Sequence, residues 1–468
     1  MDEATNSPPP AATPTPAPRL QRTLGLGDLI FYGIVLIQPV GVIGMFGVAS
    51  TLSRGHMVTT VLLAMVAMML TAASYGRMAA LYPSAGSAYT YVGRGLHPHL
   101  GFLAGWAMVL DYLIVPVINV LYGALSAERV VEQLVPGIHE GGLHHVASVL
   151  LFAVGMTVLN IRGIRWTARA NQILLAAMSV MIAAFAVVAS RHLLRTQGWG
   201  GLFSLTPFYN PRTFQWNAVW AGTSFAALTY IGFDGITTLA EDAREPKRTV
   251  PLATVLVCLI TGLAAAAQVY LAQRVAPDYA HFHNTDTAFM DVAGTVGGVW
   301  LFHATAVLMA VACFGSGLSG QVGAARLLYG MGRDNVLPRA VFGRLDARRV
   351  PTLNLALIGV VALAGALLLE YEQAGEVLNF GAFLAFMGVN LATIRVYWFR
   401  SPPGYRRRWL ADIALPALGF LFCFWIWWNL RVPAKVVGGI WFALGVAYAA
   451  LKTGGFRRSP VMLDFSEG

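Results

Sequence analysis

The sequence has 468 residues, of which 57% are hydrophobic and 12% are charged, and its mean hydropathy is +0.62. Apolar runs of roughly 20 residues, the length that crosses a bilayer core of about 30 Å, recur from one end of the chain to the other. Such a composition excludes a soluble globular protein and indicates an integral membrane protein, in which the net charge of +10 reports on topology rather than on nucleic-acid binding.

The chain begins with a proline-rich segment, "NSPPPAATPTPAPRL", that lacks the basic start and apolar core of a signal peptide. We expect residues 1–22 to be a disordered cytoplasmic tail, residues 23–452 to form a single polytopic domain, and residues 453–468 to form a cytoplasmic C-terminal tail. Twelve candidate spans begin near Leu29, Val58, Pro98, His144, Arg169, Phe214, Val250, Gly297, Thr352, Glu376, Leu410 and Pro433.

The Lys and Arg residues are distributed unevenly between the two sides of these spans. If the amino terminus is cytoplasmic, 24 of the 32 lie in cytoplasmic segments, which is the bias that positive-inside insertion produces. We therefore expect a multi-pass protein of the cytoplasmic (inner) membrane with both termini in the cytoplasm. The clusters "YRRRW" and "FGRLDARRV" are interpreted as topology signals, so membrane lipid is an expected partner and nucleic acid is not. The oligomeric state stays open.

The first span, "DLIFYGIVLIQPVGVIGMFGVAS", is interrupted near its middle by Gln38 and Pro39. A proline inside a helix removes one hydrogen bond and costs roughly 3 kcal/mol, which leaves the carbonyls around Val35 and Leu36 free to bind a ligand. The alternative is a simple kink, with the glycines of this span serving close helix packing.

Two acidic residues lie deep in apolar spans: Asp111 in the third span, and Asp234 in the sixth span beside the glycines of "TYIGFDG". A carboxylate at mid-membrane costs about 2.5 to 3.5 kcal/mol on insertion scales, so it must be paired, protonated or in contact with water. The arginines of the spans lie at their ends, so both acids favour protons or a cationic ligand with amino groups. The alternative is that either carboxylate fixes helix packing through a hydrogen bond.

Aromatic residues cluster on the same spans. Their faces stabilise ammonium groups by cation–π contact, worth about 2 kcal/mol when desolvated. The alternative for each one is helix packing or interfacial anchoring. The residues considered are Tyr32, Trp106, Tyr112, Tyr230, Phe233 and, in the small-residue stretch "CFGSGLSG" of the eighth span, Phe314.

Broken spans in first and sixth position correspond to each other if the chain has two five-helix halves, at about residues 28–190 and 214–398, followed by extra helices at about 410–452. Discontinuous helices at matching places in two halves are the best sequence indication of a transporter's substrate site. The predicted substrate-binding residues are Tyr32, Gln38, Pro39, Asp111, Tyr112, Tyr230, Ile231, Gly232, Phe233, Asp234 and Phe314.

The sequence predicts neither a metal site nor a cofactor. Cys258, Cys313 and Cys423 fall within apolar spans without metal-ligand spacing and are interpreted as packing residues. The histidines of "HEGGLHH" and "HFH" match no closed metal site. A nucleophile elbow, a phosphate loop and a metalloprotease motif are all absent from the sequence, so we do not expect an enzyme.

From about Gln21 to Lys452 the chain resembles the amino acid–polyamine–organocation permeases. The segments that carry the likeness are "YPSAGSAYTYVGRGLHPHLGFLAGW" after the second span, "GFDGITTLAEDAREPKRTVP" across the sixth and "ARLLYGMGRDNVLP" after the eighth. The resemblance implies an all-α integral membrane fold with 12 transmembrane helices. These would form a five-plus-five inverted repeat, the LeuT-like fold, with two added C-terminal helices and discontinuous first and sixth helices.

Within the family the chain is most similar to bacterial putrescine importers, through "LDYLIVPVINVL", "GFDGITTLAED" and "LNFGAFLAFMGVNL". In amino-acid-transporting relatives the first break is typically a Gly-Ser-Gly-type segment whose amides receive the substrate carboxylate. Here the corresponding place reads Ile37-Gln38-Pro39, and Pro39 has no amide hydrogen to donate. This departure agrees with a diamine, for which Asp111 and Asp234 are a natural pair.

The resemblance also bears on the coupling ion. Some relatives carry a buried lysine in the fifth span that substitutes for a sodium ion, and in this chain Met178 occupies that place. By resemblance, Asp234 matches an acidic position that takes part in binding or coupling in several relatives. A proton is then the expected coupling ion, with Asp234 or Asp111 as its carrier, and sodium stays open.

The sequence therefore predicts a secondary active transporter that imports a small amine, putrescine or a related polyamine, by alternating access. Two alternatives stay open: an amino-acid permease that works by uptake or exchange, and a sensor that binds an amine or amino acid without net transport.

Overall fold

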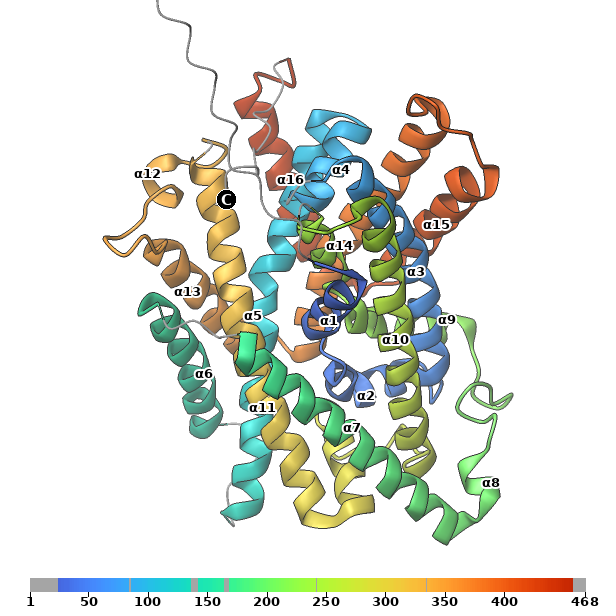
Figure 1. The fold of residues 1–468 in the computed structure, drawn as a ribbon. Coiled ribbons are helices and arrows are strands. Elements are labelled where there is room, and N and C mark those ends of the chain that lie inside the picture. Colours follow the sequence, from blue (N-terminus) through green and yellow to red (C-terminus); the bar gives the residue numbers. More distant parts are fainter. Residues whose placement is uncertain are drawn as a thin grey trace, which may run out of the picture.

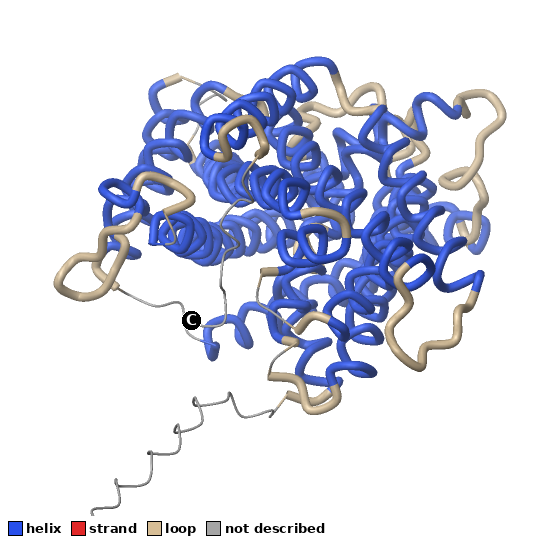
Figure 2. Tube along the Cα trace, turned by 90° about the horizontal axis from the view of Figure 1, so that it is seen from above, coloured by secondary structure: helices blue, strands red, loops and turns tan. Residues whose placement is uncertain are grey.

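The fold is described from a computed structural model that covers residues 24–83, 86–135, 142–163, 168–240, 242–333 and 335–457. The predicted tail at residues 1–22 lies outside these ranges, as does most of the predicted tail at residues 453–468, so the structure leaves both predictions as they stand. Nearly all of the described chain is helical, and its longer loops lie at the periphery when the molecule is viewed from above (Figure 2). Within the described ranges, strand-like pairing is limited to one bridge between Leu24 and Ala243.

Helices suit this chain because a helix satisfies its backbone hydrogen bonds internally, where a bilayer core offers no partner. Nine helices in the described ranges are long and apolar enough to cross a membrane, which confirms the all-α membrane fold. They pack side by side (Figure 1) and comprise α3 (Met57–Leu81), α5 (Pro98–Leu134), α6 (Leu143–Ile161), α7 (Ala168–Gln197), α10 (Pro246–Val275), α11 (Ala288–Arg333), α14 (Tyr371–Ile394) with η3 (Arg395–Phe399), η4 (Leu410–Ala414) with α15 (Leu415–Trp428), and α16 (Val432–Lys452).

Shorter helices connect or accompany the long ones. One of them, α13 (Thr352–Leu368), is apolar and has 17 residues. The others are α4 (Ser87–Gly95), α8 (Trp199–Leu202) and α12 (Arg339–Phe342).

The first apolar segment consists of two helices, α1 (Leu26–Ile37) and α2 (Gly41–Leu52), whose axes differ in direction by 52°. Gln38 lies between them with a φ of 57°, in the left-handed region that a side chain disfavours. Pro39 follows it and has no N–H group, so the helical hydrogen-bond ladder cannot continue through this point.

A second interrupted segment consists of α9 (Trp216–Ala226), η1 (Ala227–Tyr230) and η2 (Phe233–Leu239). η1 and η2 are 3₁₀ helices, and the chain turns between them at Ile231 and Gly232. Gly232 has a φ of 110°, a conformation that requires glycine.

The two interrupted segments lie against each other, since α1 packs on both η2 and α10. A Cβ atom at Gly33 would lie 2.5 Å from the Ile236 side chain, and one at Gly232 would lie 3.4 Å from the carbonyl oxygen of Leu36. Glycine at position 33 therefore permits the close approach, whereas at position 232 a Cβ atom would make an ordinary contact and glycine is required by the backbone conformation. Helix α5 contacts α4, α6, α11, α13, α14 and α16, so it lies at the centre of the molecule (Figure 1).

Candidate functional site

A cavity of about 440 Å³ lies between the two breaks and helices α5, α11 and α14. We call it the central cavity. Seven of the eleven predicted binding residues line it: Tyr32, Gln38, Asp111, Tyr112, Ile231, Gly232 and Asp234. The structure thus brings residues of three predicted spans around one space.

Asp234 is 6% exposed and lies in the first turn of η2. Amide groups in the first turn of a helix have no acceptor within the helix and carry partial positive charge. A carboxylate at this place is stabilised by about 0.3–1 kcal/mol, so the break itself supplies a favourable position for an acidic residue.

Asp111 is also 6% exposed, but it lies in the interior of α5, where the backbone amides are already used. Its Oδ1 atom is buried and has no hydrogen-bond partner among the described residues. The described residues lining the central cavity include no Lys, Arg or His, so among them the two carboxylates are the only formally charged groups. This arrangement favours a ligand that brings positive charge and hydrogen-bond donors.

Pro39 does not line the central cavity. Its carbonyl oxygen accepts a 3.1 Å hydrogen bond from the Nε2 atom of Gln268, which is buried in α10 and also donates to the carbonyl of Ala264. Gln268 therefore anchors the first break to a neighbouring helix. Gln38, one residue earlier, does line the cavity.

A smaller cavity of about 70 Å³ lies between the first break, α7 and α11. It shares Leu36, Gln38, Ser316 and Ser319 with the central cavity. Met178 of α7 lines it, at the position that the resemblance associates with a lysine. Its polar side chains are hydroxyls and amides.

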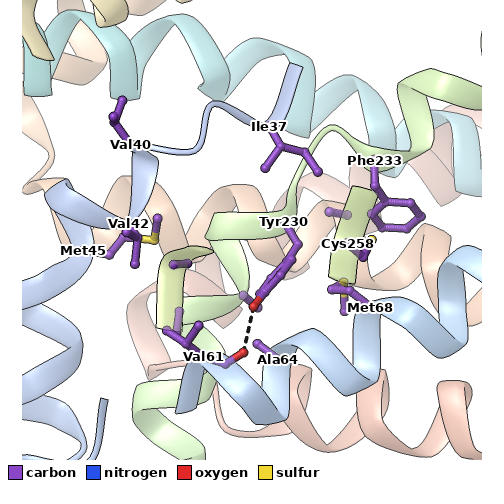
Figure 3. Close-up of a cluster of buried hydrophobic side chains, with 14 of the residues drawn as sticks. Ile37, Val40, Val42, Met45, Val61, Ala64, Met68, Tyr230, Phe233 and Cys258 are labelled. Carbon is purple, nitrogen blue, oxygen red and sulfur yellow. Dashed lines mark hydrogen bonds between the residues drawn. The ribbon is translucent and has the colours of Figure 1, made fainter. Parts of the chain in front are cut away.

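The ring of Tyr230 points away from the central cavity. It is fully buried and its hydroxyl donates a 2.8 Å hydrogen bond to the carbonyl of Val61 in α3, as Figure 3 shows. Phe233 is also fully buried, with its ring centroid 5.4 Å from that of Tyr75 and 5.1 Å from that of Phe386. Both rings pack between helices, so their positions differ from the cavity wall that the sequence predicted.

Phe314 does not line the central cavity either. Its ring meets that of Phe152 on α6, with centroids 5.7 Å apart. Trp106, the other aromatic residue considered from the sequence, stacks on Trp441 of α16 at 4.9 Å. Cation–π contact with a ligand in this cavity is thus left to Tyr32, Tyr112 and two tyrosines that sequence reasoning missed.

Those two tyrosines, Tyr122 of α5 and Tyr371 of α14, line the end of the cavity next to α2. Their ring centroids are 4.9 Å apart, and both rings press on Gly44, where a Cβ atom would lie 2.8 Å from the Tyr371 hydroxyl. Other lining residues that the sequence did not single out as binding residues are Asn119, Met309, Cys313, Ser316 and Ser319. Four small or polar residues of "CFGSGLSG" line the cavity: Cys313, Ser316, Ser319 and Gly320. The sequence drew attention to this stretch as a whole, but the residue selected from it was Phe314.

Groups of three or more metal-ligating side chains are not found within the described ranges. The three cysteines are unpaired and buried. In the loop between α10 and α11, His281 donates to Asp278 at 2.8 Å, which lowers the pKa of that exposed carboxyl.

Comparison with known sequences adds family information. Residues 26–451 match the sequence model of the family described as "Amino acid permease". The low-affinity putrescine importer PlaP of Escherichia coli K12 is 33% identical over 443 residues, which are 94% of this chain and 95% of that protein. The branched-chain amino acid permease BcaP of Lactococcus lactis is 26% identical over 441 residues, 90% of this chain and 92% of its own length. The vacuolar cationic amino acid transporter 4 of Arabidopsis thaliana is 29% identical over 392 residues, 80% and 63% of the two chains.

Proposed function

The chain belongs to the amino acid permease family, and from that membership we propose that it is a secondary active transporter that imports putrescine or a related small amine. The relatives named above are transporters and not enzymes. The observation that carries the proposal is the central cavity, in which Asp111 and Asp234 are the only formally charged residues among those described in its lining. The protein works in the cytoplasmic membrane with both termini inside, as the distribution of Lys and Arg indicates.

The charge of the cavity supports an amine over an amino acid. Two carboxylates with no cationic residue in the part of the cavity lining that the structure describes match a ligand with two ammonium groups, which supplies both the charge and the donors that Oδ1 of Asp111 lacks. At the first break, Pro39 offers no amide to a substrate carboxylate. The sequence similarity to a putrescine importer supports the same choice.

The architecture of the proposal is a five-plus-five repeat with two further helices. Adding the bent pair α1–α2, the segment from α9 to η2, and α13 to the nine long helices gives twelve spans. On this count the first repeat runs from α1 to α7 and the second from α9 to α14. The interrupted segments then hold the first place in each repeat, and substrate binds where they face each other.

Protons drive the import in this proposal, with Asp234 or Asp111 as the carrier. The small cavity beside Met178 supplies hydroxyls and amides but no carboxylate to bind sodium. In proteoliposomes, an imposed pH gradient should drive accumulation in sodium-free buffer. Accumulation that requires a sodium gradient would assign the coupling to sodium.

An amino-acid permease is the second candidate, and the similarity to BcaP and to the plant cationic amino acid transporter favours it. Its substrate carboxylate would have to meet neutral donors of the cavity, such as Gln38, Ser316 and Ser319. Competition separates the two candidates. Excess unlabelled putrescine should block uptake of labelled putrescine, and excess branched-chain or basic amino acids should leave it nearly unchanged.

The proposal is tested by replacing Asp234 with Asn, which removes the charge and keeps the size of the side chain. Asp234→Asn should abolish putrescine uptake into proteoliposomes while the protein still reaches the membrane and purifies as the wild type does. Asp278→Asn, an exposed acidic residue outside the cavity, is the matched control and should transport normally. Wild-type uptake by the Asp234 variant would overturn its assigned role.

A further inference from the structure

A second large cavity adjoins the central cavity on the side of α4. It has a volume of about 300 Å³, and its wall is formed by α4, α5 and α11. It shares Tyr112, Thr238 and Gly323 with the central cavity. We take these three shared residues as the boundary between the two spaces and call them the neck, and we call the second cavity the vestibule.

The vestibule contains one charged residue among its described lining residues, Arg326 of α11. The Arg326 side chain is exposed and has neither an ion pair nor a hydrogen bond to any part of the chain that the structure describes. The other described lining residues of the vestibule are mainly apolar and include Phe102, Met108 and Leu327. Arg77 of α3, a partly buried arginine, is by contrast paired with Asp412 at 2.5 Å.

The position of Arg326 relates it directly to the neck. It follows Gly323 by three residues in α11, which is about 4.5 Å along the helix axis and close to one turn. Both residues line the vestibule, so Arg326 lies on the vestibule face of α11. A ligand that leaves the central cavity through the vestibule passes this face.

The electrostatic potential therefore changes sign along this route. The central cavity contains two carboxylates, and the vestibule contains one exposed guanidinium that has no described partner, in a cavity whose other described lining residues are mainly apolar. An amine is attracted to the first space and repelled from the second. A substrate carboxylate would be repelled from the central cavity and attracted to the vestibule.

We propose that Arg326 is a specificity-determining residue that makes the vestibule unfavourable for cationic amines and thereby weakens their binding from that side. The inference rests on the proposed amine import, and with both termini inside the vestibule faces the cytoplasm. The cytoplasmic amine concentration needed to refill the central cavity is then higher than the external concentration needed for uptake. Arg326 does not alter the final accumulation ratio, which the coupling ion sets, because a fixed charge acts on the rates of release and return.

Transport from the two sides can be measured separately in right-side-out and inside-out membrane vesicles with radiolabelled putrescine. Arg326→Gln should lower the half-saturating concentration from the vestibule side by about three- to tenfold and leave that from the opposite side within about twofold of the wild type. Arg326→Lys keeps the charge and should behave as the wild type. Arg344→Gln removes an exposed arginine that lines neither cavity and should also change nothing.

Salt gives a second readout that a merely structural role would not produce. Raising the ionic strength from roughly 0.02 to 0.3 M shortens the screening length, so the vestibule-side half-saturating concentration of the wild type should approach that of Arg326→Gln. Equal vestibule-side half-saturating concentrations in the wild type and Arg326→Gln, or the same change in this concentration from both sides, would overturn the inference and leave the proposed function standing. A wild-type protein that transports no putrescine from either side would overturn the proposed function, and this inference with it.

Discussion

Asp111 and Asp234 line the same cavity from different backbone environments. Asp234 lies at the start of a 3₁₀ helix, where free amide groups favour a carboxylate, whereas Asp111 lies within a continuous helix and has an oxygen atom without a partner among the described residues. Without substrate, Asp111 is therefore the less well satisfied of the two. A bound ammonium group would relieve Asp111 more than Asp234.

Tyr230 provides a test of packing against binding at the residue scale. Tyr230→Phe removes the 2.8 Å hydrogen bond to the carbonyl of Val61 and nothing from the cavity wall. It should lower the free energy of unfolding by about 0.5–1.5 kcal/mol, measured by thermal or denaturant unfolding in detergent. The half-saturating putrescine concentration should stay within about twofold of the wild type. A weaker affinity with unchanged stability would place Tyr230 in the site after all.

Sequence reasoning selected Phe314 from a stretch of the eighth span in which other residues line the central cavity. Successive residues of a helix are rotated by about 100° from each other. Cys313, Ser316 and Ser319 therefore share the face toward the cavity, while Phe314 points to α6. The rotation of a helix about its axis depends on its neighbours, and a span that is apolar all round, toward protein and toward lipid alike, gives no periodic signal for it.

At the scale of elements, both interruptions were visible in the sequence because proline and glycine act locally on the backbone. The contact that anchors the first interruption was not, since Gln268 lies 229 residues from Pro39 in the chain. Nothing near Gln268 in sequence distinguishes it from a residue that packs between helices. Long-range polar contacts of this kind need the folded arrangement of α1, α2 and α10.

Gln268→Leu tests whether this anchor positions the break. The substitution removes the donor to the carbonyl of Pro39, and a buried carbonyl without a partner costs about 1–3 kcal/mol. We expect reduced stability together with a higher half-saturating putrescine concentration, because the break also carries Gln38. Ile260→Ala, at an exposed position of the same helix, is the control for a change in α10 that leaves the break intact. Normal affinity in Gln268→Leu would show that the break keeps its shape without the anchor.

At the scale of the whole molecule, α3 is tied to the segment that joins α14 and α15. The fully buried carboxylate of Asp412 accepts hydrogen bonds from Arg77 at 2.5 Å, from the hydroxyl of Tyr405 at 2.8 Å and from the amide of Arg408 at 2.6 Å. Each of these three contacts is with a hydrogen-bond donor. Removing Arg77 therefore leaves the buried charge of Asp412 without its counter-charge.

Single and double substitutions measure the strength of that connection. Arg77→Met and Asp412→Asn should each lower the free energy of unfolding by about 3–5 kcal/mol. The double variant should lose less than the sum of the two, because the second substitution no longer leaves a charge unpaired. Unfolding of the three variants in detergent gives the coupling energy. Additive losses would contradict a direct interaction.

The overall architecture could be predicted from the sequence more completely than the site. Length and hydropathy are enough to locate α3, α5 and α10, each of which contains a long apolar stretch. Apolar runs in the sequence also predicted spans near Phe214 and Thr352, but the helices found there are shorter than a full span: α13 has 17 residues, and the segment from α9 to η2 is divided into pieces. The count of twelve spans therefore depends on interpreting interrupted helices as single crossings.

The central claim is that two carboxylates hold the two ammonium ends of one diamine. Calorimetry on the purified protein with putrescine and with butylamine, its monoamine counterpart, tests it in the wild type, Asp111→Asn and Asp234→Asn. The wild type should bind putrescine at least about tenfold more tightly than butylamine, which corresponds to about 1.4 kcal/mol, and each single variant should reduce that preference to within about twofold. A preference for putrescine that is unchanged in both variants, or a wild type that binds the two amines equally, would contradict the claim.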